Sequence, residues 1–426
     1  MKLVSSFLIL LVVALTWGLR QDRSGDADKN YLTAVVTVIN TSSLQRVDQL
    51  LKINLSDFKT RHPDFNEYNF FITYRGKEIA SQVADSNLDG KAGRILIASS
   101  FGPNETKKFI IRYYPTGRKF RNYPLQTQAQ LGMKVDYDKV GGYYTRGEFR
   151  TVDSTTVPAD HFAHDALYRI EGPGWELKWI VYRFYLDSRN RTDIFGKTTG
   201  DMVLQRIGVN DLVSDSKESY SRMLDWGMDI FKVGESLGIG SVAMWNDSGA
   251  VTVSNVSRVR CFIREDGPIR SAVRTEYSDW HVGSKSYELT TVYSISAGSR
   301  LTNVALSLHG KDAEMCTGLA RHADCIFTTS SGDTGKQWSY IALYGKQSLA
   351  GDNLGTAIFY KQADVIRLTG DSLSHIVVLR ASGGNLEYYF GAAWEKEPGG
   401  IKDIRTFRAF LENERAILGK PVEIRY

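Results

Sequence analysis

Cysteine and proline are scarce in this sequence of 426 residues, which contains 3 Cys and 9 Pro. Cys261, Cys316 and Cys325 allow at most one intramolecular disulfide, so disulfide bonds are not the framework of the fold. Low-complexity segments and repeats are also absent, which excludes a solenoid and argues against a disordered chain. Cys316 and Cys325 flank His322, but three ligands at this irregular spacing are a weak signal. We therefore predict no metal site.

Charge of one sign is not concentrated anywhere along the chain. The 53 Lys and Arg residues exceed the 48 Asp and Glu residues only slightly, and the formal net charge is +5 at pH 7. Nucleic-acid-binding proteins usually carry a block of Lys and Arg, and this sequence has none. An anionic small or oligomeric ligand fits this composition better than DNA or RNA. The length predicts two or three domains of roughly 100–200 residues each.

A long hydrophobic run occurs at the start of the sequence. The run from Leu3 to Leu19 is free of charge, follows Lys2, and carries the small residues Thr16 and Gly18 before a possible cleavage point. This pattern predicts a signal peptide over residues 1–20, with an uncleaved anchor as the alternative. We therefore expect a protein of the periplasm or the extracellular space, with no membrane partner after cleavage.

Short segments rich in Val, Ile, Tyr and Phe, separated by turn residues, dominate the remainder. Segments such as 31–40, 68–74 and 107–114 predict a small N-terminal β-sandwich over residues 30–115. The basic, irregular stretch 115–124 is predicted to be a linker.

The larger part of the chain repeats this β pattern with longer and more numerous segments. It predicts a large, mainly antiparallel β-supersandwich over residues 125–426, which would be the catalytic domain of an all-β protein. Helical patterns are confined to residues 218–233 and 404–416.

One predicted strand, in the segment ELKWIVYRFYLD (176–187), carries a polar face. Because side chains alternate along a strand, Ile180, Tyr182, Phe184 and Leu186 share one face, which we assign to the core. The opposite face offers what a sugar acid requires, namely an aromatic platform, a guanidinium for a carboxylate and a phenol for proton transfer. A partly exposed face with a cross-strand ion pair is the alternative. The residues of this face are Trp179, Val181, Arg183, Tyr185 and Asp187.

A turn-rich passage just before this strand is dense in titratable residues. Two histidines with an adjacent aspartate are candidates for general acid and base catalysis, and turns commonly present functional side chains. Its titratable members are His161, His164, Asp165, Tyr168, Arg169, Glu171 and Glu176.

Six segments together resemble a known bacterial family. They are FYLDSRNRTDIFGK (184–197), LDWGMDIFKVGESLG (224–238), GPIRSAVRTEY (267–277), CTGLARH (316–322), YGKQS (344–348) and YYFGAAWEKEP (388–398). The family belongs to polysaccharide-utilisation loci, was long described as a domain of unknown function, and contains the ulvan oligosaccharide dehydratase. The resemblance covers roughly residues 145–425. It implies a cofactor-free enzyme that removes water from a non-reducing-end glucuronic or iduronic acid and yields a 4,5-unsaturated uronate.

Elimination of water across C4–C5 requires a base for the C5 proton, an acid for the departing 4-hydroxyl and a cation for the carboxylate. We assign carboxylate neutralisation to Arg183. His164 and His322 are the candidates for base and acid, and Tyr185 is a reserve proton donor.

Further residues are assigned to binding of an anionic oligosaccharide. Lys232 is the second cation, and Asp187 or Asp165 would orient one histidine in the required tautomer. Trp179 and Trp226 are candidate stacking platforms, with core packing as the alternative for Trp226.

Two other activities compete with the dehydratase. A polysaccharide lyase would use the same β-elimination to release a sugar instead of water, and a non-catalytic glycan-binding protein would use the tryptophans without an acid and base. A hydrolase with two flanking carboxylates ranks lower because no such pair stands out.

Overall fold

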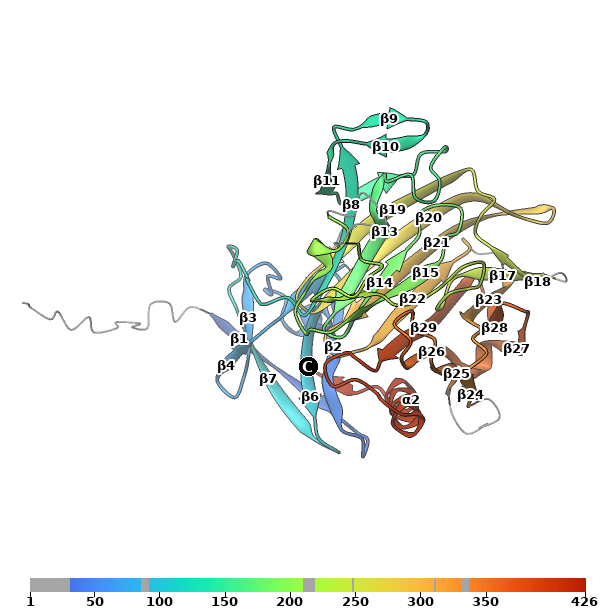
Figure 1. Cartoon of the computed structure of the whole chain (residues 1–426). Helices are drawn as coiled ribbons and strands as arrows, with labels where there is room; N and C mark the ends of the chain where they lie inside the picture. Colours follow the sequence, from blue (N-terminus) through green and yellow to red (C-terminus); the bar gives the residue numbers. More distant parts are fainter. Residues whose placement is uncertain (1–30, 86–91, 210–218, 247–248, 310–311, 331–336) are drawn as a thin grey trace, which may run out of the picture.

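The computed structural model describes residues 31–85, 92–209, 219–246, 249–309, 312–330 and 337–426 (Figure 1). The predicted signal peptide, residues 1–20, lies outside the described residues. In the described part of the chain, no helix is long and apolar enough to cross a membrane. Antiparallel sheets account for most of the fold, which confirms the predicted all-β class.

The N-terminal part is a pair of facing sheets with its own apolar core. Val36, Phe70 and Phe109 are among the fully buried residues between them, and α1 (Leu55–Arg61) buries Phe58 in the same core. The five-stranded sheet has the order β30 (Glu423–Arg425), β1 (Leu32–Ile39), β7 (Thr106–Tyr113), β3 (Phe70–Tyr74), β4 (Lys77–Ile79). The three-stranded sheet has the order β2 (Arg46–Asn54), β6 (Arg94–Phe101), β5 (Gln82–Ala84).

The last strand of the chain belongs to this N-terminal sheet. In β30, Ile424 pairs with Val38 and Arg425 with Thr37 on the edge of β1. The phenol of Tyr426 also accepts a 2.8 Å hydrogen bond from the backbone N–H of Asn54. The sequence prediction assigned all of residues 125–426 to the large domain, whereas β30 covers an edge of the small sandwich. An unpaired edge is a liability that a distant strand can cover.

Three sheets form the larger part of the molecule, and a short hairpin, β9 (Asp138–Val140) and β10 (Tyr143–Thr145), projects beyond them (Figure 1). The six-stranded sheet runs β11 (Glu148–Thr151), β8 (Thr127–Val135), β13 (Tyr168–Leu177), β14 (Ile180–Phe184), β15 (Thr192–Lys197), β16 (Gly227–Asp229). The nine-stranded sheet runs β12 (Ser154–Thr156), β19 (Arg258–Asp266), β20 (Arg270–Val282), β21 (Lys285–Ser296), β22 (Leu301–Ser307), β29 (Asn385–Trp394), β26 (Leu354–Lys361), β25 (Trp338–Gly345), β24 (Cys325–Thr329). The five-stranded sheet runs β18 (Gly249–Thr252), β17 (Ala243–Asn246), β23 (Ala313–Ala320), β28 (Ser374–Ala381), β27 (Val365–Gly370).

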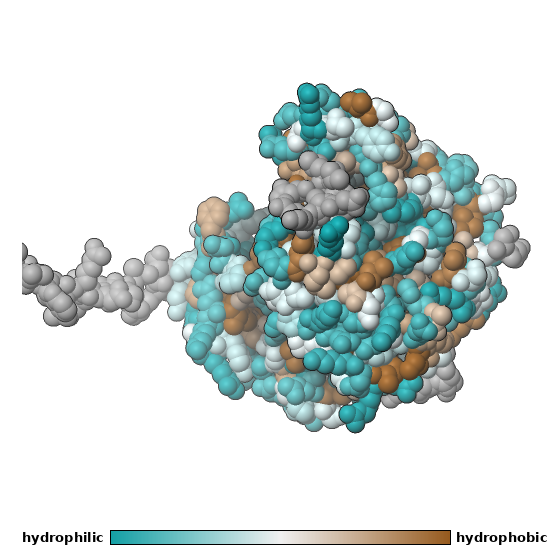
Figure 2. Space-filling view, viewed as in Figure 1, coloured by the Kyte–Doolittle hydropathy of each residue, from teal (hydrophilic) through white to brown (hydrophobic). Residues whose placement is uncertain are grey.

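One continuous apolar core joins the three larger sheets. Trp175 on β13 stacks on Tyr293 of β21, with ring centroids 5.3 Å apart, and its indole N–H donates to Thr302 on β22. The opposite face of the nine-stranded sheet is covered by α2 (Ile404–Gly419), whose Phe407 and Leu411 are buried against β25 and β26. This helix confirms the predicted helical segment 404–416. On the face shown in Figure 2, hydrophobic residues lie in small groups among hydrophilic ones.

The predicted helix over residues 218–233 is wrong for the part that the structure describes. Gly227 begins β16 and pairs with Lys197 of β15. Its φ is +134°, and a Cβ at this position would lie 1.8 Å from the carbonyl oxygen of Gly196. The chain therefore requires glycine in a non-helical conformation here, and sheet pairing overrides the helical spacing of the apolar residues.

Candidate functional site

The polar face of β14 points away from the main core. Ile180, Tyr182 and Phe184 are buried in the core shared with the nine-stranded sheet, while Val181 packs in a smaller cluster on the opposite side. Arg183 shares the side of Val181, as the alternation of side chains predicted. This places a guanidinium beside the strands β15 and β16, and its side chain is only 4% exposed.

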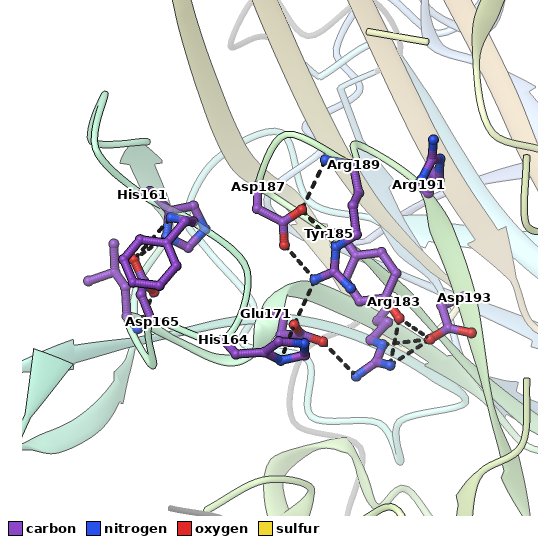
Figure 3. A network of polar contacts seen from close by, with 12 residues as sticks. His161, His164, Asp165, Glu171, Arg183, Tyr185, Asp187, Arg189, Arg191 and Asp193 are labelled. Atoms are coloured by element: carbon purple, nitrogen blue, oxygen red, sulfur yellow. Dashed lines mark hydrogen bonds and ion pairs between the residues drawn. The ribbon is translucent and has the colours of Figure 1, made fainter. Parts of the chain in front are cut away.

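The Arg183 guanidinium is surrounded by carboxylates from its own sheet (Figure 3). Its Nη2 lies 2.6 Å from Oδ2 of Asp193 on β15 and 2.6 Å from Oδ2 of Asp229 on β16, and it donates to the phenol of Tyr185 at 2.7 Å. Its Nε also donates to Asp193, at 2.9 Å. The remaining nitrogen, Nη1, is buried 3.4 Å from Glu171 Oε2 and forms no hydrogen bond in the described structure. Arg183 is therefore held by carboxylates on every side, and Glu171 faces its one nitrogen that forms no hydrogen bond.

A histidine and a glutamate form the second part of the network. His164 Nδ1 lies 2.9 Å from Glu171 Oε1, and Nη2 of Arg189 lies 2.6 Å from the same oxygen. The Arg189 guanidinium stacks 3.6 Å above the ring of Tyr185 (Figure 3). His164 and Glu171 adopt positive φ angles of 67° and 63°, beside an irregularity in the pairing of β13 with β8. These unusual conformations are typical of functional sites.

The surroundings fix opposite protonation states for this pair. Burial opposes ionisation of Glu171, but the hydrogen bond from His164 and the charges of Arg183 and Arg189 outweigh it and lower the pKa of Glu171 to about 2. The same hydrogen bond raises the pKa of His164 above its ordinary value. His164 is therefore held toward the imidazolium form, which can donate a proton.

Asp229 is in the opposite situation. Burial, together with the neighbouring charge of Asp193, raises the pKa of Asp229 to about 7, although Arg183 acts in the opposite direction. A carboxyl group whose pKa lies near neutral pH takes up and releases protons under working conditions, which is what a general base requires.

These groups converge on one pocket of about 530 Å³. This volume lies in the usual range for small-ligand sites. The pocket is lined by charged, phenolic and hydroxyl side chains with little aliphatic surface, which suits a polar ligand. The lining residues are Phe149, His161, His164, Asp165, Ala166, Tyr168, Arg169, Glu171, Arg183, Tyr185, Arg189, Ser219, Tyr220, Ser221 and Asp229.

Arg169 gives this pocket a positive charge that no carboxylate compensates. Its Nη1 donates to the carbonyl of Gln205 at 2.9 Å, and its Nη2 donates to Gln130 and to the carbonyl of Leu204 at 3.1 Å each. Its Nε is buried without a hydrogen bond, and within the described ranges no acidic side chain forms an ion pair with it. Burial lowers the pKa of Arg169 to about 10. An anionic ligand would supply the missing charge.

Two of the predicted binding residues do not reach this pocket. Trp226 is 4% exposed and packs in an apolar cluster with Phe195 and Leu204, so core packing describes it and the stacking role is wrong. Lys232 is exposed and does not line the pocket. The strand-like conformation around residue 229, which replaces the predicted helix, turns Phe231 inward and Lys232 outward.

Two further predicted site residues, His322 and Trp179, lie outside this pocket. His322 follows β23, with its ring 5.9 Å from that of Phe231, and burial lowers its pKa. It does not line the pocket, so the structure does not bring it together with His164. Trp179 lies beside a different cavity, where the guanidinium of Arg300 is 4.4 Å from the centroid of its ring.

Of the two aspartates predicted to orient a histidine, Asp165 contacts one and Asp187 does not. Asp165 lies 2.7 Å from Nδ1 of His161 and accepts from the backbone of Leu167. Asp187 binds the guanidinium of Arg189. Two histidines that line the pocket therefore have a carboxylate at Nδ1: His161 has Asp165, and His164, the predicted acid or base, has Glu171.

Sequence reasoning missed Asp193 and Asp229 and gave no role to Arg169 or Glu171. Asp229 stands between the apolar residues Met228 and Ile230, and an acid inside an apolar segment is a signal that could have been used. Asp193 has a similar setting, before Ile194 and Phe195. Their meeting at Arg183 depends on strand pairing that local sequence does not encode.

Metal ligation finds no support in the described residues, where no group of three or more His, Cys, Asp and Glu side chains is placed to hold an ion. The three cysteines are unpaired, with Cys261 and Cys316 buried.

A family model described as "Domain of unknown function (DUF4861)" matches residues 38–424. The chain matches none of the curated proteins. It is similar to a solved structure of a protein in glycosyl hydrolase family 38 from Enterococcus faecalis, with a TM-score of 0.47 and 9% identity, over 92% of this chain and 47% of that one. It is also similar to an alpha-mannosidase from Enterococcus faecalis V583, with a TM-score of 0.43 and 8% identity, over 92% of this chain and 46% of that one. The chain thus spans about half the length of these two proteins.

Proposed function

The chain belongs to the DUF4861 family, and from the geometry of its pocket we propose that it is a carbohydrate dehydratase. The proposed reaction removes water across C4–C5 of a non-reducing-end glucuronic or iduronic acid of an ulvan-type oligosaccharide and leaves a 4,5-unsaturated uronate. The observation that carries the proposal is the convergence on one pocket of His164 with Glu171, the carboxyl of Asp229 and the guanidinium of Arg169, which has no carboxylate partner in the described structure. The predicted signal peptide supports action in the periplasm or outside the cell.

Binding of the uronate carboxylate is the first requirement. Arg169 has no carboxylate partner in the described structure, whereas Arg183 is already paired with Glu171, Asp193 and Asp229. Neutralising the carboxylate makes the C5 proton more acidic, because negative charge develops beside it during elimination. A well-placed donor of this kind contributes on the order of 10²–10³ in rate. This assignment shifts the main carboxylate-binding role from Arg183 to Arg169.

Asp229 is the proposed base and His164 the proposed acid. Asp229 takes the C5 proton, the electron pair of the C5–H bond forms the C4–C5 double bond, and the C4–O bond breaks. The departing hydroxyl takes a proton from the imidazolium of His164 and leaves as water, so that atoms and charge balance. Glu171 keeps His164 protonated and fixes its orientation through the 2.9 Å contact at Nδ1. Tyr185, buried between Arg183 and Asp193, has a raised pKa and is a positioning residue in this scheme.

The proposal is tested with the purified chain lacking residues 1–20 and saturated uronate-ended oligosaccharides. Ultraviolet absorbance of the conjugated enol ether and product mass are followed together. Loss of one water per chain end with rising absorbance supports the dehydratase. Chain shortening with rising absorbance overturns it in favour of a lyase, and binding without either change overturns it in favour of a glycan-binding protein.

Replacement of His164 by glutamine is expected to lower kcat by about 10²-fold, since a general acid contributes about 10²–10⁴. The His164 side chain is 74% exposed, so folding should be preserved. Because a proton donor must be protonated, wild-type activity should fall as pH rises above the raised pKa of His164. This fall should be absent from the pH–rate profile of the variant. The exposed His281→Gln is the control. An unchanged pH profile would remove His164 from the mechanism.

Replacement of Arg169 by glutamine is expected to raise KM and to lower kcat/KM by about 10²-fold, because the substrate carboxylate loses its counter-charge. Discrimination between a uronate-ended oligosaccharide and its methyl ester should shrink in parallel. Arg206→Gln, at a side chain that is 50% exposed, is the matched control. Retention of the full preference for the free acid would show that another group binds the carboxylate.

A further inference from the structure

A second cavity, of about 490 Å³, lies where the N-terminal sandwich meets the nine-stranded sheet. One wall is the sheet of β2 and β6, the second is the outer face of β20, β21, β22 and β29, and α2 closes the third side. None of its lining residues lines the pocket of His164. We call this cavity the interdomain groove.

The walls of the interdomain groove are held in fixed positions. The side chain of Gln82 accepts from the backbone N–H groups of Ile269 and Arg270, at 3.0 and 2.8 Å, and donates to the carbonyl of Arg270 at 2.9 Å. Gly298, with φ +75°, approaches Asp48 so closely that a Cβ there would lie 2.2 Å from the Cβ of Asp48. A preformed groove loses little conformational entropy when a ligand binds.

Cations gather on one side of this groove. In the antiparallel pair of β2 and β6, Lys52 is opposite Leu96 and Asn54 is opposite Arg94, so Lys52 and Arg94 share one face. Within the described residues neither side chain forms an ion pair, and Arg270 of the opposite wall has Glu265 at 2.6 Å. Removal from water, and then repulsion by Arg270 and Arg94, lowers the pKa of Lys52.

The acidic residues of the groove do not cancel this charge. The lining includes Asp48 and Glu414, and removal from water raises the pKa of Glu414 to about 7, so it is only partly ionised at neutral pH. Arg300 is bound to Glu397 outside the lining. The ring surfaces of Trp179, Tyr389 and Phe410 complete the walls, and such surfaces pack against the apolar faces of sugars.

We propose that the interdomain groove is a second binding site for an acidic oligosaccharide, whose carboxylate or sulfate groups bind Lys52, Arg94 and Arg270. Arg270 already has Glu265 as a partner, but Lys52 and Arg94 form no ion pair within the described residues, and an anion that enters the fixed groove would supply their counter-charge. This proposal rests on the proposed function only for the class of ligand, which is an acidic oligosaccharide at both the groove and the pocket. Its occupant would be held away from the reacting atoms, so the groove serves to retain the chain rather than to transform it.

The test is calorimetric titration of the Asp229→Asn protein, in which turnover is suppressed, with a sulfated ulvan hexasaccharide and its desulfated form. We expect two sites per chain, and one site when Lys52→Ala and Arg94→Ala are added. Arg75→Ala with Lys77→Ala, which removes two exposed cations outside the groove, is the matched control and should keep both sites. A loss of groove binding with the desulfated sugar would assign recognition to sulfate, and its retention would assign it to carboxylate.

The outcome separates this proposal from that for the pocket. If the pocket does not bind the sugar, the titration should give one site, which the Lys52 and Arg94 substitutions abolish. The groove proposal would be overturned if the number of sites were the same with and without the Lys52 and Arg94 substitutions. It would also be overturned if the Arg75 and Lys77 control lost the same site, or if the sugar did not bind at all. The groove lies away from the reacting atoms. The protein that carries Lys52→Ala and Arg94→Ala but retains Asp229 should therefore turn over a short uronate-ended substrate at an initial rate within about twofold of wild type.

Discussion

Replacement of Asp229 by asparagine is expected to lower kcat by about 10³-fold, within the range of 10²–10⁴ that a positioned general base contributes. Asparagine has the shape of aspartate and still accepts from Arg183, but it takes up no proton. A base with a pKa of about 7 becomes active as pH rises through neutrality, so wild-type kcat should rise across this range. That rise should be absent in the variant, and a pH–rate series on both proteins measures it.

Stability provides the control for the Asp229 prediction. The folded-state pKa of about 7 lies above the ordinary value of 3.8, so the proton is bound more tightly in the folded state. The stability that this carboxyl contributes is present at low pH and is lost as pH rises from about 4 to 7. Asp229→Asn should therefore be at least as stable as wild type at pH 8. Asp225→Asn, at a side chain that is 77% exposed, should leave kcat unchanged. Wild-type activity in Asp229→Asn would exclude this base.

The parts of the fold that the sequence predicted are those set by local pattern. Alternation of apolar and polar side chains from residue 179 to 187 placed Arg183 on the correct face of β14, and the amphipathic segment 404–416 is helical. Local pattern failed at residue 227, where close approach to Gly196 imposes a strand. It also failed at β30, whose partner β1 lies nearly the whole chain away.

The candidate site was predictable only in part, because its groups meet across strand pairs. His164 and Arg183 were identified, since one stands in a histidine-rich turn and the other in an alternating strand. The partners that set their states, Glu171 and Asp229, come from β13 and β16, on either side of the β14–β15 hairpin. Register decides these contacts, and a register that joins distant segments is not written in the spacing of either segment. His322 was chosen for its residue type, without knowledge of these contacts, and it lies outside the pocket.

Replacement of Arg183 by methionine is expected to lower the free energy of unfolding by about 3–5 kcal/mol, because it leaves buried carboxylates without their counter-charge. Asp193 is fully buried and Asp229 nearly so, and both lie 2.6 Å from the guanidinium. Methionine retains most of the volume of the arginine stem, so the loss reports charge rather than packing. Urea denaturation of both proteins at pH 8 measures the difference.

Electrostatic coupling can be separated from other effects of this substitution. Adding Asp229→Asn to Arg183→Met removes one of the stranded charges, so the double variant should recover part of the lost stability, as a double-mutant cycle reports. Arg206→Met, which breaks an exposed 3.4 Å pair with Asp225, should change stability by less than about 0.5 kcal/mol. A loss below about 1 kcal/mol for Arg183→Met, or no recovery in the double variant, would mean that the carboxyl of Asp229 is already neutral in the folded protein at pH 8. A neutral carboxyl cannot accept the C5 proton, and the assignment of Asp229 as the base would then fail.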